Sequence, residues 1–559
     1  MNNMIKQAFI EKKVPRPTFW TIVTFILFAL AIFFLIYPLG GLVTRSFTSS
    51  DTGAFTLSNY IDFFRLPYYF NTLKNSFAVS ITTTIFALIL GVPMGYVVAR
   101  FNIPGKKILN AMVVISLLSP PFIGAYSWII LLGRNGFITN IVRQVGIEMP
   151  TIYGFNGLIL VFTLKLFPFI YMYVQGALNS FDSSLEEAAE NLGVHGFKKL
   201  ITVTFPLIMP TITSGAVIVF MTSLADLGTP MLIGEGYKVL PVLVYEEYMS
   251  EIGGNATVAS TLSVVIIICS LLVLLLQKVI ISKKSYHMSG LRPPEVKKLN
   301  PVPYAILTVL CYLVALMALA PQITTITTSF IKTHGPLFVP GFSLNSYRSV
   351  WFKLSANIIR TFIYSTIAMA FMIIIGMFSS YIIVRRRSRL SSVLDFILMS
   401  PYVIPGAVLG IVLIMAFNKP PLILTGTAVI MIVSYTIRKI PYIIRSSTGI
   451  LYQLDLSSEE ASINLGVSPL KTFFKITAVL MLPGVLSGAI LSWIATINEL
   501  SSTLILYSGR TGTISVAIYT EIMKDGYGTA AALASILTFA TIISLIIFNK
   551  FTKGKGSVV

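Results

Sequence analysis

The chain has 559 residues, of which 55% are hydrophobic and only 11% are charged. Soluble globular domains carry about 25% charged residues, so this composition excludes an ordinary soluble enzyme. Apolar residues cluster in runs of about 20, the length at which a helix crosses about 30 Å of hydrocarbon. The sequence therefore predicts an all-α polytopic membrane protein embedded in a lipid bilayer.

The formal net charge is +20, from 41 Lys and Arg residues against 21 Asp and Glu residues. In a membrane protein, a basic excess of this kind usually belongs to the cytoplasmic loops. We therefore expect no nucleic-acid partner.

The apolar runs predict about twelve transmembrane helices, six in each half of the chain. The six of the first half are expected at 20–44, 72–99, 108–133, 155–178, 203–229 and 256–281. The six of the second half are expected at 302–328, 358–384, 393–417, 422–446, 476–506 and 529–549.

Basic residues gather at the chain ends and in alternate loops between the predicted helices. They include Lys6, Lys12, Arg100, Lys106, Lys107, Lys198, Lys199, Lys283, Lys284, Arg385, Arg386, Arg387, Lys550 and Lys553. With twelve spans these segments all fall on one side, which the positive-inside rule assigns to the cytoplasm. We expect a multi-pass protein of a bacterial inner membrane with both termini cytoplasmic.

A basic, proline-containing segment at 283–301 divides the chain near its middle. The segments expected on either side are a cytoplasmic N-terminus at 1–19, a first lobe at 20–282, a second lobe at 302–550 and a cytoplasmic tail at 551–559. The linker itself is expected in the cytoplasm.

The two halves repeat each other at an offset of 273 residues. The matching positions include Glu186 and Glu459, Glu187 and Glu460, Gly193 and Gly466, and Pro210 and Pro483. Two six-helix halves that match in parallel are typical of transporters built from two related lobes around a pathway.

The repeat is most evident in two cytoplasmic segments, at about 183–206 and 456–479. Each predicts a short polar helix, a glycine break and a second helix that enters the membrane. Ser184 with Glu187, and Ser457 with Glu460, have the spacing of a capping box. Two such segments on one side of the membrane predict a docking surface for a soluble partner.

These segments resemble the coupling loop of permease subunits of ABC importers, which reads Glu-Ala-Ala, three residues, Gly, nine residues and Ile-x-Leu-Pro. The first copy fits at Glu187, Ala188, Ala189, Gly193 and Pro206, and the second at Glu460, Ala461, Gly466 and Ile476. The second copy departs from the pattern at Ser462 and Val479, which leaves open whether both loops bind a partner equally well.

The resemblance implies the type I ABC importer permease fold and a role as a transport subunit. It implies two partners, namely ABC ATPase subunits in two copies and an external substrate-binding protein. The chain has no G-x-x-x-x-G-K-[ST] phosphate-binding loop. ATP and Mg²⁺ would therefore be used by the partner ATPase, and we expect no cofactor, metal site or catalytic residue in this chain.

The fusion of both lobes in one chain resembles the ferric-iron branch of this family, which implies ferric iron as the substrate. Permeases for 2-aminoethylphosphonate, thiamine and sugar phosphates look similar and remain alternatives. An ion-coupled secondary transporter is a further alternative, although such a carrier has no need of duplicated cytoplasmic docking helices.

Ionisable residues within the predicted helices are candidates for the translocation pathway, because buried charge in a membrane is costly. Asp226 and its repeat mate Glu499 could attract a cation, or could each bond a neighbouring helix end. Lys165 and its mate Arg438 could neutralise these acids or bind an anion. The charges alone leave the sign of the cargo open.

A second matched set lies toward the outer side, where Tyr245 precedes Glu247 and Tyr519 precedes Glu521. Oxygen ligands of this kind suit a hard cation such as Fe(III). Tyrosine is also common at membrane interfaces for reasons unrelated to ligand binding.

Overall fold

The computed structural model describes residues 18–50, 52–118, 120–179, 183–250, 254–282, 301–335 and 337–552. The chain is almost entirely helical over these residues, and its one sheet there is an antiparallel pair of short strands. Most of the expected linker at 283–301 and of the tail at 551–559 lies outside the described residues.

The elements of the first half run in the following order. They are α2 (Phe19–Ala31), η1 (Ile32–Ile36), α3 (Tyr37–Ser46), α4 (Ser58–Arg65), α5 (Pro67–Arg100), α6 (Lys106–Leu118), α7 (Pro121–Leu132), α8 (Phe137–Gln144), α9 (Phe155–Asn179), α10 (Ser183–Asn191), α11 (Gly196–Lys199), η2 (Leu200–Thr204), α12 (Phe205–Ala225), α13 (Gly228–Ile233), α14 (Leu240–Met249) and α15 (Ala256–Ser282).

The second half repeats this order after its first helix and a hairpin. Its elements are α16 (Pro301–Ser329), β1 (Ile331–His334), β2 (Leu337–Phe342), α17 (Asn345–Arg385), α18 (Arg389–Met399), η3 (Ser400–Tyr402), α19 (Gly406–Phe417), α20 (Ala428–Gln453), α21 (Ser457–Asn464), α22 (Pro469–Thr472), η4 (Phe473–Thr477), α23 (Ala478–Ile497), α24 (Thr503–Leu506), α25 (Ile514–Met523) and α26 (Tyr527–Thr552).

The twelve predicted spans all correspond to helices, but they are not all simple spans. Nine helical runs of the described chain are long and apolar enough to cross a membrane. The predicted spans 108–133 and 393–417 are bent, by 101° after α6 and by 110° between α18 and α19. Counting each bent pair as one span gives eleven spans among the described residues. Helix α20 is not counted, and it carries three basic residues, Arg438, Lys439 and Arg445.

Three helices of each half form a tightly packed group. These are α5, α9 and α12 in the first half, and α17, α20 and α23 in the second. Glycines allow the close approach, since a β-carbon at Gly91 would lie 2.6 Å from Cβ of Ile170. In the second half, a β-carbon at Gly488 would lie 2.7 Å from Cα of Ile443. Small residues at such contacts are the usual means of packing helices in lipid.

The first helix of each half packs against the other half as well as its own, since α3 also contacts α15 and α16 also contacts α26. Helices α2 and α3 contact α17, α18 and α19 of the second half, whereas α16 contacts α6 and α7 of the first half. Trp20 at the start of α2 is buried and stacks on Tyr381 of α17, with ring centroids 4.3 Å apart. The two halves are therefore interlocked through their first helices.

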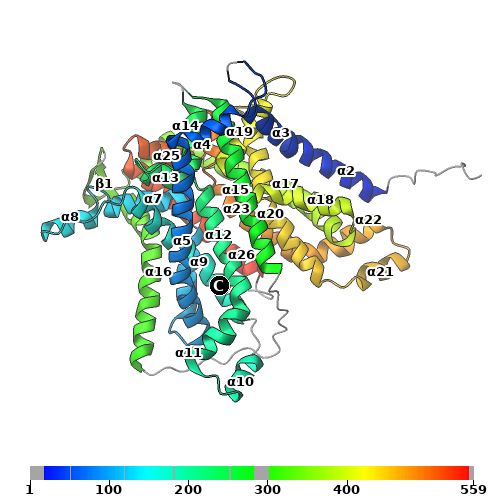
Figure 1. Cartoon of the computed structure of the whole chain (residues 1–559), viewed down its shortest axis with the longest axis horizontal. Helices are drawn as coiled ribbons and strands as arrows, with labels where there is room; N and C mark the ends of the chain where they lie inside the picture. Colours follow the sequence, from blue (N-terminus) through cyan, green and yellow to red (C-terminus); the bar gives the residue numbers. More distant parts are fainter. Residues whose placement is uncertain are drawn as a thin grey trace, which may run out of the picture.

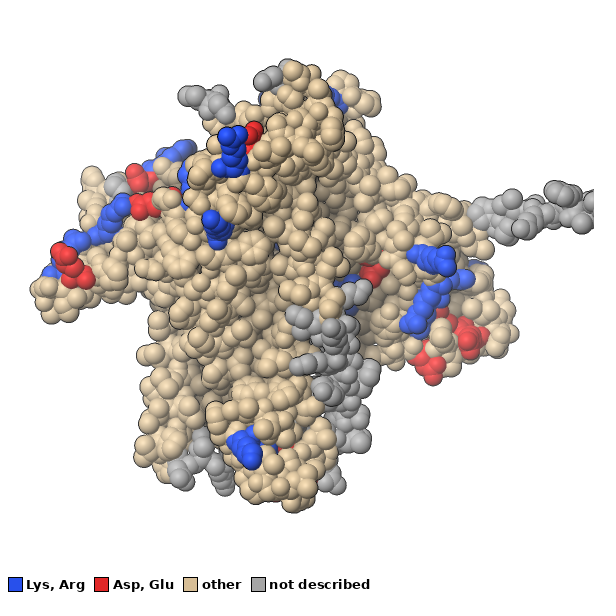
Figure 2. All heavy atoms as spheres, viewed as in Figure 1, with Lys and Arg blue, Asp and Glu red and all other residues tan. Residues whose placement is uncertain are grey.

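The molecule has two arms that end in separate polar loops. Figure 1 shows α5, α9 and α12 leading down to α10 and α11, while α17 and α20 lead toward α21 and α22 at the right of the view. Figure 2 shows that on this face the charged side chains gather at the extremities, with a broad surface of uncharged residues between them. Such a surface suits a lipid environment.

The close packing of α5 on α9 gives a test of this architecture. Replacing Gly91 by alanine should destabilise the protein by about 1–3 kcal/mol, because the added carbon would push Ile170 away. Thermal unfolding of the purified protein in detergent measures the effect. The control is Gly176→Ala in α9, where an added β-carbon meets nothing within 4 Å and should be neutral or stabilising. Equal unfolding temperatures for the two variants would contradict this packing.

Candidate functional site

The two predicted coupling loops have the same backbone structure. Gly193 and Gly466 both have φ of +81°, the left-handed conformation that the sequence predicts at the end of each short helix. The N–H of Val194 donates to the carbonyl of Ala189 at 2.9 Å, and Val467 donates to Ser462 at 3.1 Å. These bonds satisfy carbonyls at the helix ends, as in a Schellman motif. Each loop therefore makes a sharp turn between its two helices.

The capping box predicted at Ser457 and Glu460 is wrong. Helix α21 begins at Ser457 itself, and the residue before it, Leu456, has no side chain that can make the capping hydrogen bond. The N–H of Ser457 donates instead to the carboxylate of Asp455 at 3.0 Å. The start of this helix is thus fixed by an acidic side chain two residues upstream.

One glutamate in each loop points inward and joins the loop to its transmembrane arm. Glu186 is buried and accepts from Arg100 at 2.6 Å and from the hydroxyl of Thr204 at 2.8 Å. Glu459 is also buried and accepts from Arg385 at 3.1 Å and from the hydroxyl of Tyr381 at 3.2 Å.

The two arginines that hold these glutamates occupy equivalent places. Arg100 is the last residue of α5, and Arg385 is the last residue of α17. Because both arginine side chains are at least nine-tenths buried, each ion pair is shielded from water. Each coupling helix is therefore fixed to the end of a membrane-spanning helix.

The next residue of each loop points outward. Glu187 and Glu460 are exposed, as are Ala188 and Ala461, whereas Ala189 is buried. Beyond them, the side chains of Leu192 and Leu465 are 83% and 84% exposed. Each loop thus exposes a carboxylate and a leucine, together with further apolar side chains that include Phe197 in the first loop and Ile463 in the second.

The second helix of each loop is held to the first by different chemistry. In the first loop, Lys199 forms an ion pair with Glu190 and lies 3.8 Å from Glu186. In the second loop, Ser462 and Thr472 share a hydroxyl hydrogen bond of 2.9 Å. The substitution of Ser462 for the second alanine of the pattern therefore has a structural partner.

The acidic pathway candidates are both satisfied by neighbouring groups. Glu499 is buried and forms ion pairs with Arg438 and Lys439, each at 2.7 Å. It also accepts from the N–H of Ser502 at 3.2 Å, at the start of α24. Asp226 accepts from the N–H of Thr229 at 2.9 Å, at the start of α13. Both carboxylates thus bond a neighbouring helix end, which is one of the two roles considered from the sequence.

The same region brings together the basic candidates. Lys165 on α9 interacts electrostatically with Asp226, and Asp226 also interacts with Arg438 of the other half. The halves touch here, because a β-carbon at Gly228 would lie 3.1 Å from the side chain of Leu500. Lys439 was not among the candidates predicted from the sequence, although a second basic residue next to Arg438 within an apolar helix was a usable signal. Its repeat mate is Leu166, so the repeat itself did not reveal it.

The outer tyrosine candidates also approach one another. Tyr519 interacts electrostatically with Tyr245 and with Tyr507, so the two predicted mates lie near each other although they belong to different halves. Glu247 instead turns toward α5, where the hydroxyl of Tyr69 donates to it at 3.4 Å. Tyr245 and Glu247 therefore lie on different sides of α14.

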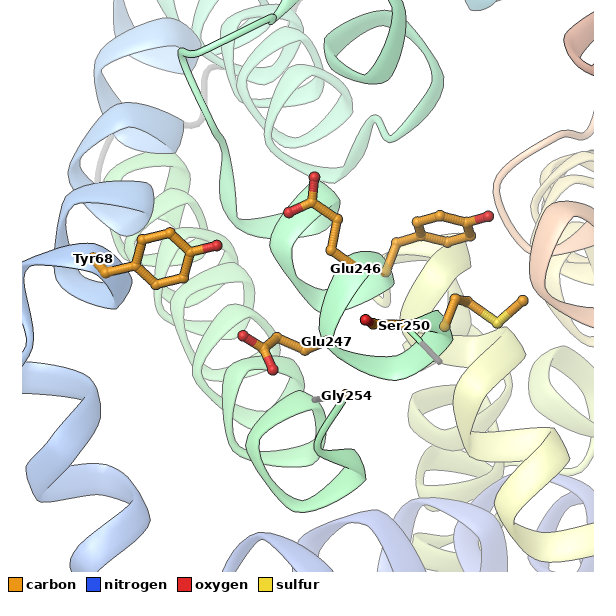
Figure 3. A pocket seen from close by; sticks show the side chains of 7 residues that line it. Tyr68, Glu246, Glu247, Ser250 and Gly254 are labelled. Atoms are coloured by element: carbon orange, nitrogen blue, oxygen red, sulfur yellow. The ribbon is translucent and has the colours of Figure 1, made fainter. Parts of the chain in front are cut away.

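A pocket of about 500 Å³ opens beside α14. Its lining consists of Tyr68, Tyr245, Glu246, Glu247, Met249, Ser250 and Gly254. Figure 3 shows Tyr68 on α5 facing the side chains of Glu246 and Glu247. Lys238 pairs with Glu246 at 2.6 Å, which raises the pKa of Lys238, whereas burial raises the pKa of Glu247. The pocket offers carboxylate and phenol oxygens, and one of its carboxylates, that of Glu246, is already paired with Lys238.

Among the described residues, no three His, Cys, Asp or Glu side chains lie together in a way that could hold a metal ion. Paired apolar bundles, with matched polar loops at one end and buried charges where they meet, define a membrane transport subunit. The pattern of the family described as binding-protein-dependent transport system inner membrane component matches residues 88–286 and 372–555. The chain belongs to this family of ABC importer permeases.

Individual relatives cover most of the chain. The ferric transport system permease protein FbpB of Actinobacillus pleuropneumoniae is 29% identical, over 93% of this chain and 76% of that protein. The putative ferric transport system permease protein FbpB 1 of Haemophilus influenzae is 29% identical, over 86% of this chain and 77% of that protein. Among solved structures, a bacterial ABC transporter that imports alginate is 18% identical over 51% of this chain and 99% of that chain, with a TM-score of 0.40.

The inward and outward glutamates should respond differently to the same substitution. Glu186→Gln removes the carboxylate that accepts from the buried Arg100, which should lower the free energy of unfolding by about 3–5 kcal/mol. The neighbouring variant Glu187→Gln should change it by less than about 0.5 kcal/mol, because that side chain is exposed. Thermal or denaturant unfolding in detergent compares the two. A larger loss for Glu187→Gln would contradict the inward role of Glu186.

Proposed function

We propose that this chain is the membrane permease of an ATP-driven importer of ferric iron. The assignment of ferric iron as the substrate is supported by similarity to two permeases named for ferric transport, which extends over 86–93% of the chain. Similarity over both halves and the region between them includes the helices that would line the pathway. Iron is the cargo here, and the chain itself needs no resident metal to carry it.

The coupling loops would dock on two ATPase subunits in the cytoplasm, where ATP and Mg²⁺ are used. The exposed Glu187 and Glu460 suit basic groups on those subunits, and the exposed Leu192 and Leu465 suit apolar pockets. With the basic loops in the cytoplasm, we expect both chain termini on that same side and the α14 pocket on the outside. An external binding protein would deliver the cargo to that outer side.

Movement of the ATPases would reach the membrane through the buried glutamates. The ion pair of Glu186 with Arg100 makes α10 move with α5, and the pair of Glu459 with Arg385 makes α21 move with α17. Since α5 and α17 pack closely within their own helix groups, each arm would move as one body. Two arms that rock about the buried charges between them would open the pathway to one side at a time.

The sharp turns after the coupling helices allow a test of this docking. Replacing Gly193 or Gly466 by valine should disfavour the left-handed turn by about 1–2 kcal/mol. Since a β-carbon at either glycine would meet nothing within 4 Å, the loss should come from the turn and should displace the exposed leucine beside it. Substrate-stimulated ATP hydrolysis and uptake by the reconstituted complex should then become uncoupled.

The matched control for this variant is Gly449→Ala in α20, which has equal space and a backbone that accepts alanine. Full uptake and full stimulated ATPase activity in both glycine-to-valine variants would show that these loops do not couple the two processes.

The substrate is tested by direct uptake into vesicles that carry the permease, its ATPase and its binding protein. We expect ATP-dependent accumulation of ferric iron and no accumulation of 2-aminoethylphosphonate, thiamine or a sugar phosphate. Vesicles with an ATPase that cannot hydrolyse ATP provide the control. Uptake of one of the other compounds without iron would reject iron as the cargo, although not the family assignment.

A further inference from the structure

The buried charges where the two halves meet do not balance. Lys165, Asp226, Arg438, Lys439 and Glu499 form this group, which we call the junction cluster. Three of its members are bases and two are acids, so its formal charge is +1. The junction cluster lies where the start of α13 meets the turn before α24, at the contact between Gly228 and Leu500.

The surplus charge comes from one residue that the repeat does not explain. The offset of 273 pairs Lys165 with Arg438 and Asp226 with Glu499, so each half holds one base and one acid. Lys439 is additional, because the matching position in the first half is Leu166. The first half shows that an apolar residue is tolerated at this place in the fold.

Glu499 would also have hydrogen-bonding partners without Lys439. One oxygen of Glu499 already accepts from Arg438 and from the N–H of Ser502, and Lys439 binds the other oxygen. The Lys439 side chain is only 12% exposed, so keeping its charge there is costly. An ionisable residue that is kept within the membrane at such a cost usually has a function, and in a transporter that function is contact with the transported substrate.

We propose that the junction cluster selects an anionic cargo and that Lys439 is the residue that sets this selectivity. Lysine and arginine lining a constriction favour anions, whereas a bare cation meets a buried charge of its own sign. The inference rests on the proposed function: if ferric iron is the cargo, it crosses this junction while still bound to anionic oxygen ligands, as a complex of net negative charge.

The sign of the transported charge tests this directly. The complete complex is reconstituted in proteoliposomes, with the binding protein loaded with ferric iron in excess inorganic phosphate. Iron accumulation and the transport current are then recorded on the same preparation. We expect iron to enter together with negative charge. Iron entry with a positive current, or with none, would overturn the selectivity for anions and leave the iron assignment intact.

Variants at Lys439 test whether the junction cluster determines this transport. Lys439→Leu copies Leu166 of the first half, makes the formal charge zero, and should slow iron uptake at least about tenfold. Lys439→Arg keeps the charge and should retain most of the uptake. Unfolding temperature and assembly with the ATPase show that both variants fold. Equal or faster uptake by the folded Lys439→Leu variant would overturn the proposal.

The same assay separates this inference from the substrate assignment. If inorganic phosphate accumulates with a negative current and iron does not, the cargo is an anion and the ferric-iron proposal fails. In that case the role of Lys439 is supported, provided that Lys439→Leu slows phosphate entry.

Discussion

A buried carboxylate fixes each coupling loop to the arm above it, and the other functional features depend on this attachment. Glu186 and Glu459 lie in polar surface helices, yet each carboxylate is held by an arginine at the end of a long membrane helix. Because separating a buried ion pair leaves an uncompensated charge, the loop and the helix end stay together. A force on the loop therefore reaches the membrane without a flexible joint.

The arms can transmit such a force because they are closely packed and interlocked. Glycines bring α5 against α9, and α20 against α23, so that backbones meet with few long side chains between them. The first helix of each half contacts both halves and so joins them at the flanks. The remaining contact between halves includes the junction cluster, where buried charges are held by ion pairs and helix ends that rocking of the arms would rearrange.

The two halves differ in polar interactions at corresponding places in the repeat. An ion pair between Lys199 and Glu190 in the first loop is replaced by a hydroxyl pair in the second, between Ser462 and Thr472. Ion pairs near the surface weaken with salt, whereas hydroxyl pairs do so less. At the junction cluster, Lys439 of the second half occupies the sequence position that Leu166 holds in the first. A permease fused into one chain can keep such differences, since its halves need not be identical.

The sequence alone determined the features that depend on local chain properties. Lengths of apolar runs located the helices, because spanning hydrocarbon requires a fixed number of residues. The repeat located both coupling loops, and glycine at positions 193 and 466 predicted the left-handed turns that other residues disfavour. The bends after α6 and α18 escaped prediction, since continuous apolar runs look the same whether straight or broken.

Only the tertiary structure decided which charged groups act together. Successive residues on a helix differ by about 100° in direction, so the sequence could not say whether Glu186 or Glu187 faces inward. That choice depends on Arg100, which is 86 residues away in the chain. The pairing of Glu499 with Lys439 likewise depends on how α20 packs against the turn after α23. Spacing within a segment fixes its turns and caps, whereas the partner of a buried charge is fixed by which distant helix is packed beside it.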